Sequence, residues 1–486
     1  MEHPMHSRVE QNQNSPCLLM GKVYNITEIS GRKVRVVKKQ TYSLTEGPLF
    51  WNIIRYTIPI ILTSILQLLF NAADLVVVGR FCGSLSVAAV GATGSITHLM
   101  VNFFVGLSAG AGVTVAHALG GRQEETVHRT VHTAMAAAFV SGLILTVLGV
   151  SCSGLFLQMM GTPDNVLPLS SVYMKIYFAG ITFNMVYNFA AAILRAAGDT
   201  KSPLLYLTLA GVVNVALNVF FVTVLHMNVA GVALATTLSQ GVSAVLVLWA
   251  LMRRTDACRF AFKKMRFYGL QLSKILRIGL PAGIQSSLFA ISNVIIQSTI
   301  NSFGGILMSG NAASANIEGF VYVTMNAFHQ TAVNFTGQNV GAGQYDRVKK
   351  IFGYSLAGVA VAGMLAGSSA WFFGEQLLGI YITDSAEAIA YGVVRLTYIS
   401  LPYFVCGLMD VCTGSLRGMG ASLAPMLISV LGVCGFRILW INTVFRMIPT
   451  PECLYLSYLI SWILTFGVQF GAFWSVYRKH TRAALH

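Results

Sequence analysis

Three carboxylates stand inside long apolar stretches of the sequence. They are Asp74 in LQLLFNAADLVVVGR, Glu318, and Asp410 in LMDVCTGSLRG. A charged side chain at the centre of a bilayer costs about 2.5 to 3.5 kcal/mol on insertion scales, so each of these residues needs a chemical reason. A buried carboxylate can carry a proton or bind a cation. Asp74 is the leading candidate for both roles, and a solvated carboxylate near a helix end is the alternative interpretation.

Neutral polar side chains accompany Asp74 in the same half of the chain. Asn214 and Asn218 are four residues apart, which places them on one face of a helix. Sodium binds several oxygen ligands, and one carboxylate with amide and hydroxyl oxygens would neutralise it, so sodium at Asp74 is a candidate. Hydrogen bonding between helices is the alternative role for any single Asn. The polar set comprises Gln67, Tyr173, Asn188, Asn214, Asn218 and Thr236.

The position of Asp74 constrains the helix that carries it. A straight helix from Trp51 would place Asp74 about 35 Å along its axis, at the far membrane interface. Pro59 lies between the two residues, and a proline inside a helix bends it. We therefore predict a hinge at Pro59 that keeps Asp74 within a helical bundle.

The composition predicts a polytopic membrane protein. Of 486 residues, 55% are hydrophobic and 10% are charged, against about 25% charged in soluble domains. Twelve helices of about 20 residues fit the chain and leave no separate soluble catalytic domain, so no enzyme and no cofactor are predicted. The predicted spans are 51–79, 86–118, 127–150, 168–194, 202–225, 230–252, 275–302, 307–339, 348–373, 388–415, 421–446 and 454–477.

The basic residues indicate orientation and not a nucleic-acid partner. The net charge is +15, but all except five of the 32 Lys and Arg fall in the tails, in loops on one side or at their helix edges. This is the positive-inside pattern, with both termini cytoplasmic in a multi-pass inner-membrane protein. Lys175 and Arg395 are expected to snorkel to the outer interface or to favour anions in a cavity. The five exceptions are Arg80, Lys175, Arg395, Arg437 and Arg446.

The two halves of the chain repeat each other at a nearly constant shift in residue number. Pro59 in YTIPI matches Pro281 in IGLPA, a shift of 222. ALGGRQEETV from Ala118 matches NVGAGQYDRV from Asn339 at a shift of 221, and LRAAGDTKSP from Leu194 matches LRGMGASLAP from Leu416, again at 222. Six spans per half make the halves parallel repeats, and such repeats typically form a cavity between two bundles that opens alternately to either side.

The repeat and the charge pattern predict the domain boundaries. A polar basic tail covers residues 1–45, and a basic cytoplasmic linker covers residues 253–274 between the two six-span lobes. The N-lobe is 46–252, the C-lobe 275–478 and the C-terminal tail 479–486. Glycines four apart, Gly106 with Gly110 and Gly337 with Gly341, predict close helix packing within the spans.

Several motifs in fixed order resemble the multidrug and toxic compound extrusion (MATE) transporters, and most closely their bacterial DinF-like branch. They are LTEGPLFWNIIRYTIPI, LFNAADLVVVGR, VAAVGATGSI, GLSAGAGVTVAHALGG and LRAAGDTKSP, and the similarity runs from about Ser43 to the C-terminal tail. The resemblance implies an all-α membrane protein with an N-lobe and a C-lobe of six helices each. It also implies export of organic, often cationic, compounds in exchange for protons or sodium.

The resemblance assigns roles to particular residues. Asp74 corresponds to the aspartate of the first helix that carries the coupling ion, and Pro59 to the proline that bends this helix. Asn218 departs from the pattern, because several DinF-like members have a second aspartate there. Asp410 resembles the tenth-helix aspartate of the NorM-like branch, whose seventh-helix glutamate is missing from residues 281–299. The polar positions matched around the N-lobe site are Gln67, Tyr173, Asn188, Asn214 and Thr236.

The prediction is therefore a monomeric antiporter of small organic compounds in the lipid bilayer, with coupling at Asp74, Asn188, Asn214, Asn218 and Thr236. Gln67, Tyr173, Asp410 and Arg437 are assigned to the substrate cavity. The main alternative is a flippase or exporter of a lipid-linked or anionic metabolite on a related fold. An intramembrane transferase and a passive channel are further alternatives, and uphill accumulation separates a channel from an antiporter.

Overall fold

The computed structural model describes residues 17–19, 22–29, 32–36, 44–383 and 385–483, and the chain divides into two units, Met1–Tyr42 and Ser43–His486. In the first unit, β1 (Cys17–Leu19), β2 (Lys22–Ile29) and β3 (Arg32–Val36) form an antiparallel sheet in the order β1-β2-β3. The sequence analysis predicted no element in this tail. Val and Ile alternating with polar residues in KVYNITEI and RKVRV is the pattern of strands. The remainder of the predicted tail before Leu44 lies outside the described residues.

The second unit is built from helices in the part that the structure describes. Its first half, which we call the N-lobe, contains seven helices and a π-helical turn after α6. They are α1 (Leu49–Phe81), α2 (Ser84–Gly120), α3 (Glu124–Met159), α4 (Leu167–Ala179), α5 (Ile181–Ala196), α6 (Lys201–Val219), η1 (Phe220–Val224) and α7 (Asn228–Met252).

The second half, which we call the C-lobe, begins with α8 after a linker at 253–268 that holds the short turn η2 (Phe262–Lys264). Helix α8 starts six residues before its predicted start, and the last helix continues beyond the predicted start of the C-terminal tail. The elements are α8 (Gly269–Asn301), α9 (Gly305–Gly341), α10 (Tyr345–Phe372), α11 (Gly374–Tyr381), α12 (Ala386–Arg395), η3 (Leu396–Ser400), α13 (Tyr403–Gly418), α14 (Leu423–Ser429), η4 (Val430–Gly435), α15 (Phe436–Asn442), α16 (Val444–Met447) and α17 (Pro451–Ala483).

Each predicted span coincides with a helix or with helical segments that follow one another. Among the described residues, ten helices are long and apolar enough to cross a membrane, and α4 with α5, bent by 46°, makes an eleventh. Helix α9 is also 37 residues long, but polar residues such as Glu318 interrupt its apolar sequence. It coincides with the eighth predicted span, 307–339, and is second in the C-lobe as α2 is second in the N-lobe.

The backbone repeats as the sequence does. Gly83 and Gly304 precede α2 and α9 with φ of 84° and 96°, and Gly198 and Gly420 follow α5 and α13 with φ of 82° and 83°. The third such position holds Arg122 at φ 52° in the N-lobe and Gly343 at φ 70° in the C-lobe. The members of each pair are separated by the same offsets as the sequence motifs. Turns that require a left-handed backbone therefore stand at matching places in the two lobes.

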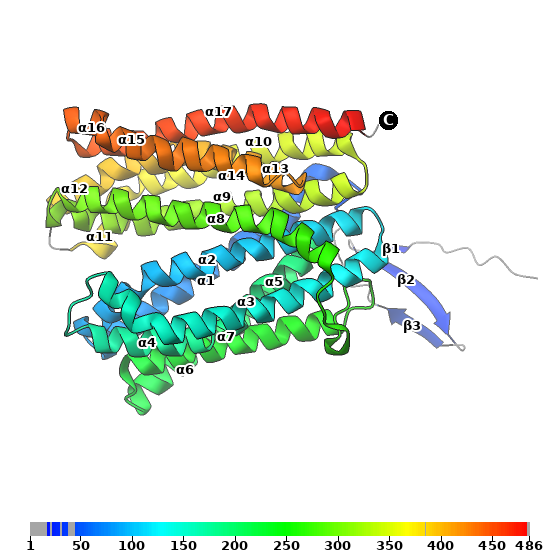
Figure 1. Ribbon diagram of the computed structural model, residues 1–486, viewed down its shortest axis with the longest axis horizontal. Coiled ribbons are helices and arrows are strands. Elements are labelled where there is room, and N and C mark those ends of the chain that lie inside the picture. The colour runs from blue at the N-terminus through cyan, green and yellow to red at the C-terminus, as the bar shows by residue number, and fades with distance from the viewer. Residues whose placement is uncertain (1–16, 20–21, 30–31, 37–43, 384, 484–486) are drawn as a thin grey trace, which may run out of the picture. The chain divides into compact units, whose positions relative to one another are not determined.

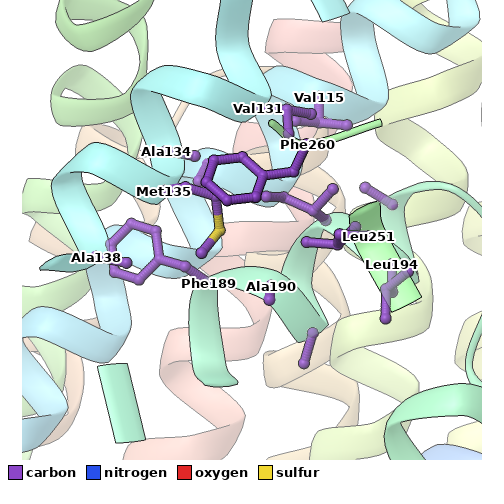
Figure 2. Packing of buried hydrophobic residues seen from close by; sticks show 14 of the residues in the cluster. Val115, Val131, Ala134, Met135, Ala138, Phe189, Ala190, Leu194, Leu251 and Phe260 are labelled. Atoms are coloured by element: carbon purple, nitrogen blue, oxygen red, sulfur yellow. The ribbon is translucent and has the colours of Figure 1, made fainter. Parts of the chain in front are cut away.

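The two lobes lie side by side as separate bundles (Figure 1). In the N-lobe, apolar residues of α2, α3, α5 and α7 form the largest buried cluster, and Figure 2 shows Phe260 of the linker among them, near Val115 and Val131. The linker is also held by His132, whose Nε2 accepts a hydrogen bond from the backbone nitrogen of Ala261 at 3.1 Å. In the C-lobe, Phe352 and Phe473 stack within a separate cluster. Each lobe therefore has a core of its own.

Glycines bring the lobes into contact where α2 crosses α8. A Cβ atom on Gly106 would collide with the backbone of Gly283, and one on Gly110 with the backbone of Gly279. A Cβ atom on Gly341 of α9 would likewise collide with the backbone of α2. The close packing predicted for these spacings is confirmed, and its partner is a further glycine pair four residues apart on α8.

Hydrogen bonds between the lobes gather at the end of the helices where the linker lies, which we call the linker end. Thr57 Oγ1 lies 2.8 Å from Thr331 Oγ1, and His117 Nε2 lies 2.7 Å from the carbonyl oxygen of Gly418. Gln338 Nε2 donates to the carbonyl oxygen of Ala196 at 2.6 Å. Among the described residues, the hydrogen bonds that join the helices of the two lobes all come from this end. The lobes are thus closed together at the linker end.

Candidate functional site

Asp74 lies in the half of α1 away from the linker end, and its partly buried carboxylate accepts hydrogen bonds from two other helices. Asn218 of α6 donates through Nδ2 to Oδ1 at 2.5 Å, and Thr236 of α7 donates through Oγ1 to Oδ2 at 3.3 Å. Both donors are neutral. None of the ion pairs found in the described part of the chain includes Asp74. Its negative charge is therefore stabilised by dipoles and is free of a cationic side chain.

Asn214 extends this cluster along α6. Asn218 Nδ2 lies 3.3 Å from Asn214 Oδ1, and Asn214 Nδ2 lies 3.5 Å from Thr236 Oγ1. Asn218 is fully buried, and its Oδ1 has no hydrogen-bond partner among the described residues. An unpaired buried amide oxygen is costly unless something else binds it. The cluster thus combines a carboxylate with an amide oxygen that is available to a proton or a cation.

The backbone changes its winding directly beside this cluster. The π-helical turn η1, Phe220–Val224, begins two residues after Asn218. In the C-lobe, η3 begins directly after Arg395, and η4 ends two residues before Arg437. Single π-helical turns within α-helices often occur at functional sites, because they re-aim side chains at the cost of regular hydrogen bonding.

The structure brings together only part of the predicted N-lobe set. Tyr173 of α4 packs against the apolar cluster that contains Val77 and Val78 of α1, so it lies beside the helix of Asp74. Asn188 does not reach Asp74, because its Nδ2 donates at 2.9 Å to both the carbonyl oxygen and Oδ1 of Asn184. Gln67 is exposed on α1. The observed cluster is therefore Asp74, Asn214, Asn218 and Thr236, with Tyr173 at its edge.

Pro59 is buried inside α1 and does not interrupt it, because Leu49–Phe81 is a single helix. Its carbonyl oxygen accepts a hydrogen bond from Thr63 Oγ1 at 2.6 Å. Proline removes one backbone donor from the helix at this point. The hinge predicted here stays a prediction about movement, and Asp74 is held in the bundle by its contacts with α6 and α7.

The C-lobe contains a buried ion pair that sequence reasoning missed. Arg395 of α12 donates through Nε and Nη2 to both carboxylate oxygens of Glu318 of α9, at 2.9 and 2.7 Å, and both side chains are 8% exposed. Arg395 Nη1 also donates to Asn311 Oδ1 at 2.5 Å, and Tyr455 donates to the same oxygen at 3.3 Å. Neither predicted alternative for Arg395, snorkelling or lining a cavity, is correct. The available signal was that opposite charges occur in two spans of one lobe.

None of the hydrogen bonds or ion pairs found in the described part of the chain joins the remaining C-lobe candidates to this ion pair. Arg437 is 4% exposed, with its guanidinium 3.9 Å from the centre of the Tyr458 ring, so it is packed inside the lobe in this conformation. Asp410 is partly buried on α13, and its carboxylate accepts none of the hydrogen bonds found among the described residues. Arg417, two turns further on, donates to Gln285 Oε1 at 2.8 Å.

Comparisons with known proteins agree on one family. The family model MatE matches residues 59–220 and 281–441, so its two matches are separated by the offsets of the sequence motifs at their starts and at their ends. Among curated proteins, the chain is 27% identical over 401 residues to "Probable multidrug resistance protein YpnP" of Bacillus subtilis (strain 168), covering 81% of this chain and 87% of that one. It is 23% identical over 353 residues to an "FAD transporter" of Shewanella oneidensis, covering 71% and 77%.

Solved structures show the same fold. A multidrug resistance MATE family transporter of the MOP superfamily in an outward-facing conformation superposes with a TM-score of 0.84 at 19% identity, covering 91% of this chain and all of that chain. A MOP superfamily transporter from Pyrococcus furiosus, described as having a binding pocket of reverse polarity, superposes with a TM-score of 0.84 at 18% identity, covering 92% and 100%. The two family matches together span more than half of the chain, and the protein therefore belongs to the MATE family of multi-pass membrane transporters.

Proposed function

We propose that this transporter exports organic cations out of the cell in exchange for protons or sodium, with Asp74 binding the coupling ion. The observation that carries the proposal is the carboxylate of Asp74, which is held by the neutral donors Asn218 and Thr236 beside the unpaired Oδ1 of Asn218. A carboxylate without a cationic partner can take up and release a positive ion within a transport cycle. No resident cofactor takes part.

The donor set suits either coupling ion. In the conformation described, Asn218 presents its NH2 group to Asp74, as expected for a free carboxylate. If the amide of Asn218 rotates, its Oδ1 faces Asp74 and can accept the hydrogen bond of a protonated carboxyl group. The same rotation would place amide, hydroxyl and carboxylate oxygens around one sodium ion.

The arrangement of the lobes supports alternating access. Their contacts gather at the linker end, and the positive-inside rule places the linker, and with it both termini, in the cytoplasm of a bacterial cell. The conformation would then be closed to the cytoplasm. Substrate would bind while the cytoplasmic side is open. Ion binding at Asp74 in the outward-open state would then weaken the binding of substrate by a coupling free energy of about 1 to 3 kcal/mol. A single chain with two lobes is sufficient for this cycle.

An anionic or lipid-linked substrate is the second candidate. Arg417 is 8% exposed and its Nε has no partner among the described residues, so one buried cationic group of the C-lobe is incompletely satisfied. A relative is named an FAD transporter, and FAD is an anion. Against this, Glu318 neutralises Arg395 and the Tyr458 ring covers Arg437, which leaves few cationic groups to attract an anion.

Efflux of a fluorescent cation from proteoliposomes tests the first proposal, with imposed proton or sodium gradients compared one at a time. We expect wild type to accumulate the dye against its gradient, Asp74→Asn to lose at least tenfold in rate, and Asp410→Asn to keep at least half. Persistent coupling in Asp74→Asn would move the ion site to Asp410 or Glu318. A folded wild-type protein that transports no cationic dye but exports an anionic dye would support the second candidate.

A further inference from the structure

The linker end holds a cavity of about 700 Å³ between the lobes that the proposed transport cycle does not use. Its wall includes His117 of α2 and Gln123, which precedes α3, from the N-lobe. The C-lobe contributes residues of α8, the end of α9, the connection between α13 and α14 around Gly420, and the end of α17. The cavity therefore exists in this form only while the two lobes are together at this end.

The charge of the cavity wall is of one sign. Lys274 and Arg277 come from α8 and Lys479 from α17, with His117 and His480 beside them, and none of the described residues that line it is acidic. None of the ion pairs found in the described part of the chain includes these three cations. Like charges gathered without a counter-ion repel one another and attract an anion from solution. Three cations that line one cavity suit a phosphate group, which offers more acceptor oxygens than a carboxylate does.

The rest of the wall is apolar. Ile278, Val340, Met419 and Val476 line the same cavity. A second hollow of about 550 Å³ is lined by residues of α17, among them Trp474, Arg478 and Arg482, and Lys479 lines both hollows. Trp with Arg and Lys at the end of a spanning helix is typical of the membrane interface. An anion that also carries an apolar part would therefore contact both kinds of wall.

We propose that this cavity binds a phosphate-bearing anion and that the bound anion holds the lobes together at the linker end. The phosphate lies between Lys274 and Arg277 of α8 and Lys479 of α17, which all belong to the C-lobe, and the N-lobe closes the cavity over it with His117 and Gln123. The shared chemistry is a phosphate monoester or diester, which either a membrane phospholipid or a soluble metabolite can present. The neighbouring hollow along α17, lined by Trp474 with Arg478 and Arg482, favours the phospholipid.

The consequence for transport rests on the alternating access proposed above. When the lobes separate at the linker end, His117 leaves Gly418 and the cavity loses its N-lobe wall. A ligand that binds one conformation more tightly than another shifts the population toward that conformation. Binding therefore favours the form closed at the linker end and slows loading of substrate from this side.

Thermal unfolding of the purified full-length protein tests binding independently of transport. The probes are short-chain phosphatidylglycerol, short-chain phosphatidylcholine and glycerol 3-phosphate. We expect phosphatidylglycerol to raise the unfolding temperature saturably. Phosphatidylcholine, whose choline offsets the charge of its phosphate, should have no such effect. Glycerol 3-phosphate acting at equal concentration would identify a soluble phosphate as the ligand, and failure of both phosphatidylglycerol and glycerol 3-phosphate would overturn the proposal.

Matched variants locate the site. Lys274→Gln/Arg277→Gln/Lys479→Gln removes three cations from the cavity, whereas Lys263→Gln/Lys264→Gln/Arg266→Gln removes three exposed cations from the linker. We expect the first variant to weaken the apparent affinity for the active probe at least tenfold and the second to change it less than twofold. An equal loss of affinity in both variants would show that the probe responds to surface charge in general, and would overturn the proposed site.

Single substitutions keep the comparison informative if a triple variant does not fold. Lys479→Gln should weaken the apparent affinity for the probe about threefold, and Lys263→Gln should leave this affinity unchanged. Dye efflux measured with and without phosphatidylglycerol in the membrane then tests whether the bound anion favours the conformation closed at the linker end. An efflux rate that is equal in both membranes, with binding intact, would overturn the conformational part and leave the binding site standing. Absence of efflux in both membranes would instead bear on the proposed function.

Discussion

The two lobes share a fold, but they stabilise a carboxylate inside the helical bundle with different kinds of partner. In the N-lobe, Asp74 is held by Asn218 and Thr236, both neutral. In the C-lobe, Glu318 is joined by two hydrogen bonds to Arg395, and both side chains are buried. A carboxylate neutralised by an arginine has little affinity for another cation, whereas one held by dipoles keeps it. The lobes therefore share a fold and differ in how they compensate the charge of these two carboxylates: an arginine neutralises Glu318, whereas Asp74 is in none of the ion pairs found in the described part of the chain.

The repeat offset shows how this difference is distributed along the chain. At the shift that relates Pro59 to Pro281, Arg395 corresponds to Tyr173, and Asp410 corresponds to Asn188. The position that corresponds to Asp74 at the same shift is Ile296, which is buried in an apolar cluster of the C-lobe. Charged residues of one lobe thus correspond to neutral residues of the other. Each lobe contains a polar centre, but the two centres occupy different positions of the shared fold.

The largest expected difference between the two carboxylates is in the free energy of unfolding of their variants. Glu318→Gln leaves the Arg395 guanidinium buried without a counter-ion, which typically costs about 3 to 5 kcal/mol. Asp74→Asn removes no partner of a buried cation and should cost about 1 kcal/mol, the net value of a hydrogen bond. Thermal unfolding in one detergent measures both variants. If Asp74→Asn lost as much stability as Glu318→Gln, Asp74 would contribute to the stability of the fold as much as Glu318 does.

The double variant Glu318→Gln/Arg395→Met is the control for this prediction. It removes the charge that Glu318→Gln leaves unpaired, and replacing a buried ion pair by apolar groups is often neutral or stabilising. We expect it to recover most of the loss. If the double variant is as unstable as the single one, shape and packing explain the effect, and the charge pairing assigned to the C-lobe would be wrong.

A second carboxylate in the N-lobe would sharpen the comparison. If one proton exchanges for one monovalent cation, no net charge moves and membrane potential contributes nothing to accumulation. Asn218→Asp places a second carboxylate beside Asp74, and a second proton per cycle would add up to about 2.3 kcal/mol per 100 mV. Dye accumulation at imposed potassium diffusion potentials measures this. Accumulation that ignores the potential in the variant would show that the added carboxylate carries no ion.

Much of the fold was predictable, because twelve long apolar stretches and a repeated set of motifs are local signals. The two family matches bear out the repeat offset, and the close approaches of Gly106 and Gly341 bear out the predicted packing. The site was predictable less fully. Sequence spacing placed Asn214 and Asn218 on one face of a helix, but it could not show that Asn188 turns to Asn184.

Other features depend on pairings that sequence separation hides. Arg395 finds Glu318 across 77 residues, and without this contact an arginine near a span end is expected to snorkel. Strands β2 and β3 have apolar and polar residues in alternation over only a few positions, within a stretch whose composition is that of a basic tail. Hydropathy alone also undervalues α9, because polar residues such as Asn311, Ser314 and Glu318 are buried within the protein.

The smallest predicted effect distinguishes the coupling ions. Thr236→Val removes a hydroxyl that donates to Asp74 Oδ2 at 3.3 Å. Loss of one such hydrogen bond corresponds to about 1 kcal/mol, or about a fivefold change in ion affinity. The sign depends on the ion. A proton would bind about fivefold more tightly because the ionised carboxylate loses a stabilising donor, whereas sodium would bind more weakly because it loses an oxygen ligand.

The matched control for this substitution lies in the other lobe. Thr413 is buried on α13 and donates to Gln469 Oε1 at 3.0 Å, so Thr413→Val removes a comparable hydrogen bond far from Asp74 in the sequence. Dye efflux at varied proton or sodium concentration gives the apparent affinity for each variant. The N-lobe substitution should shift it and the C-lobe substitution should leave it within twofold of wild type. A shift in Thr413→Val as large as that in Thr236→Val would mean that ion binding depends on both lobes, since a local ligand effect reaches only the carboxylate that it contacts.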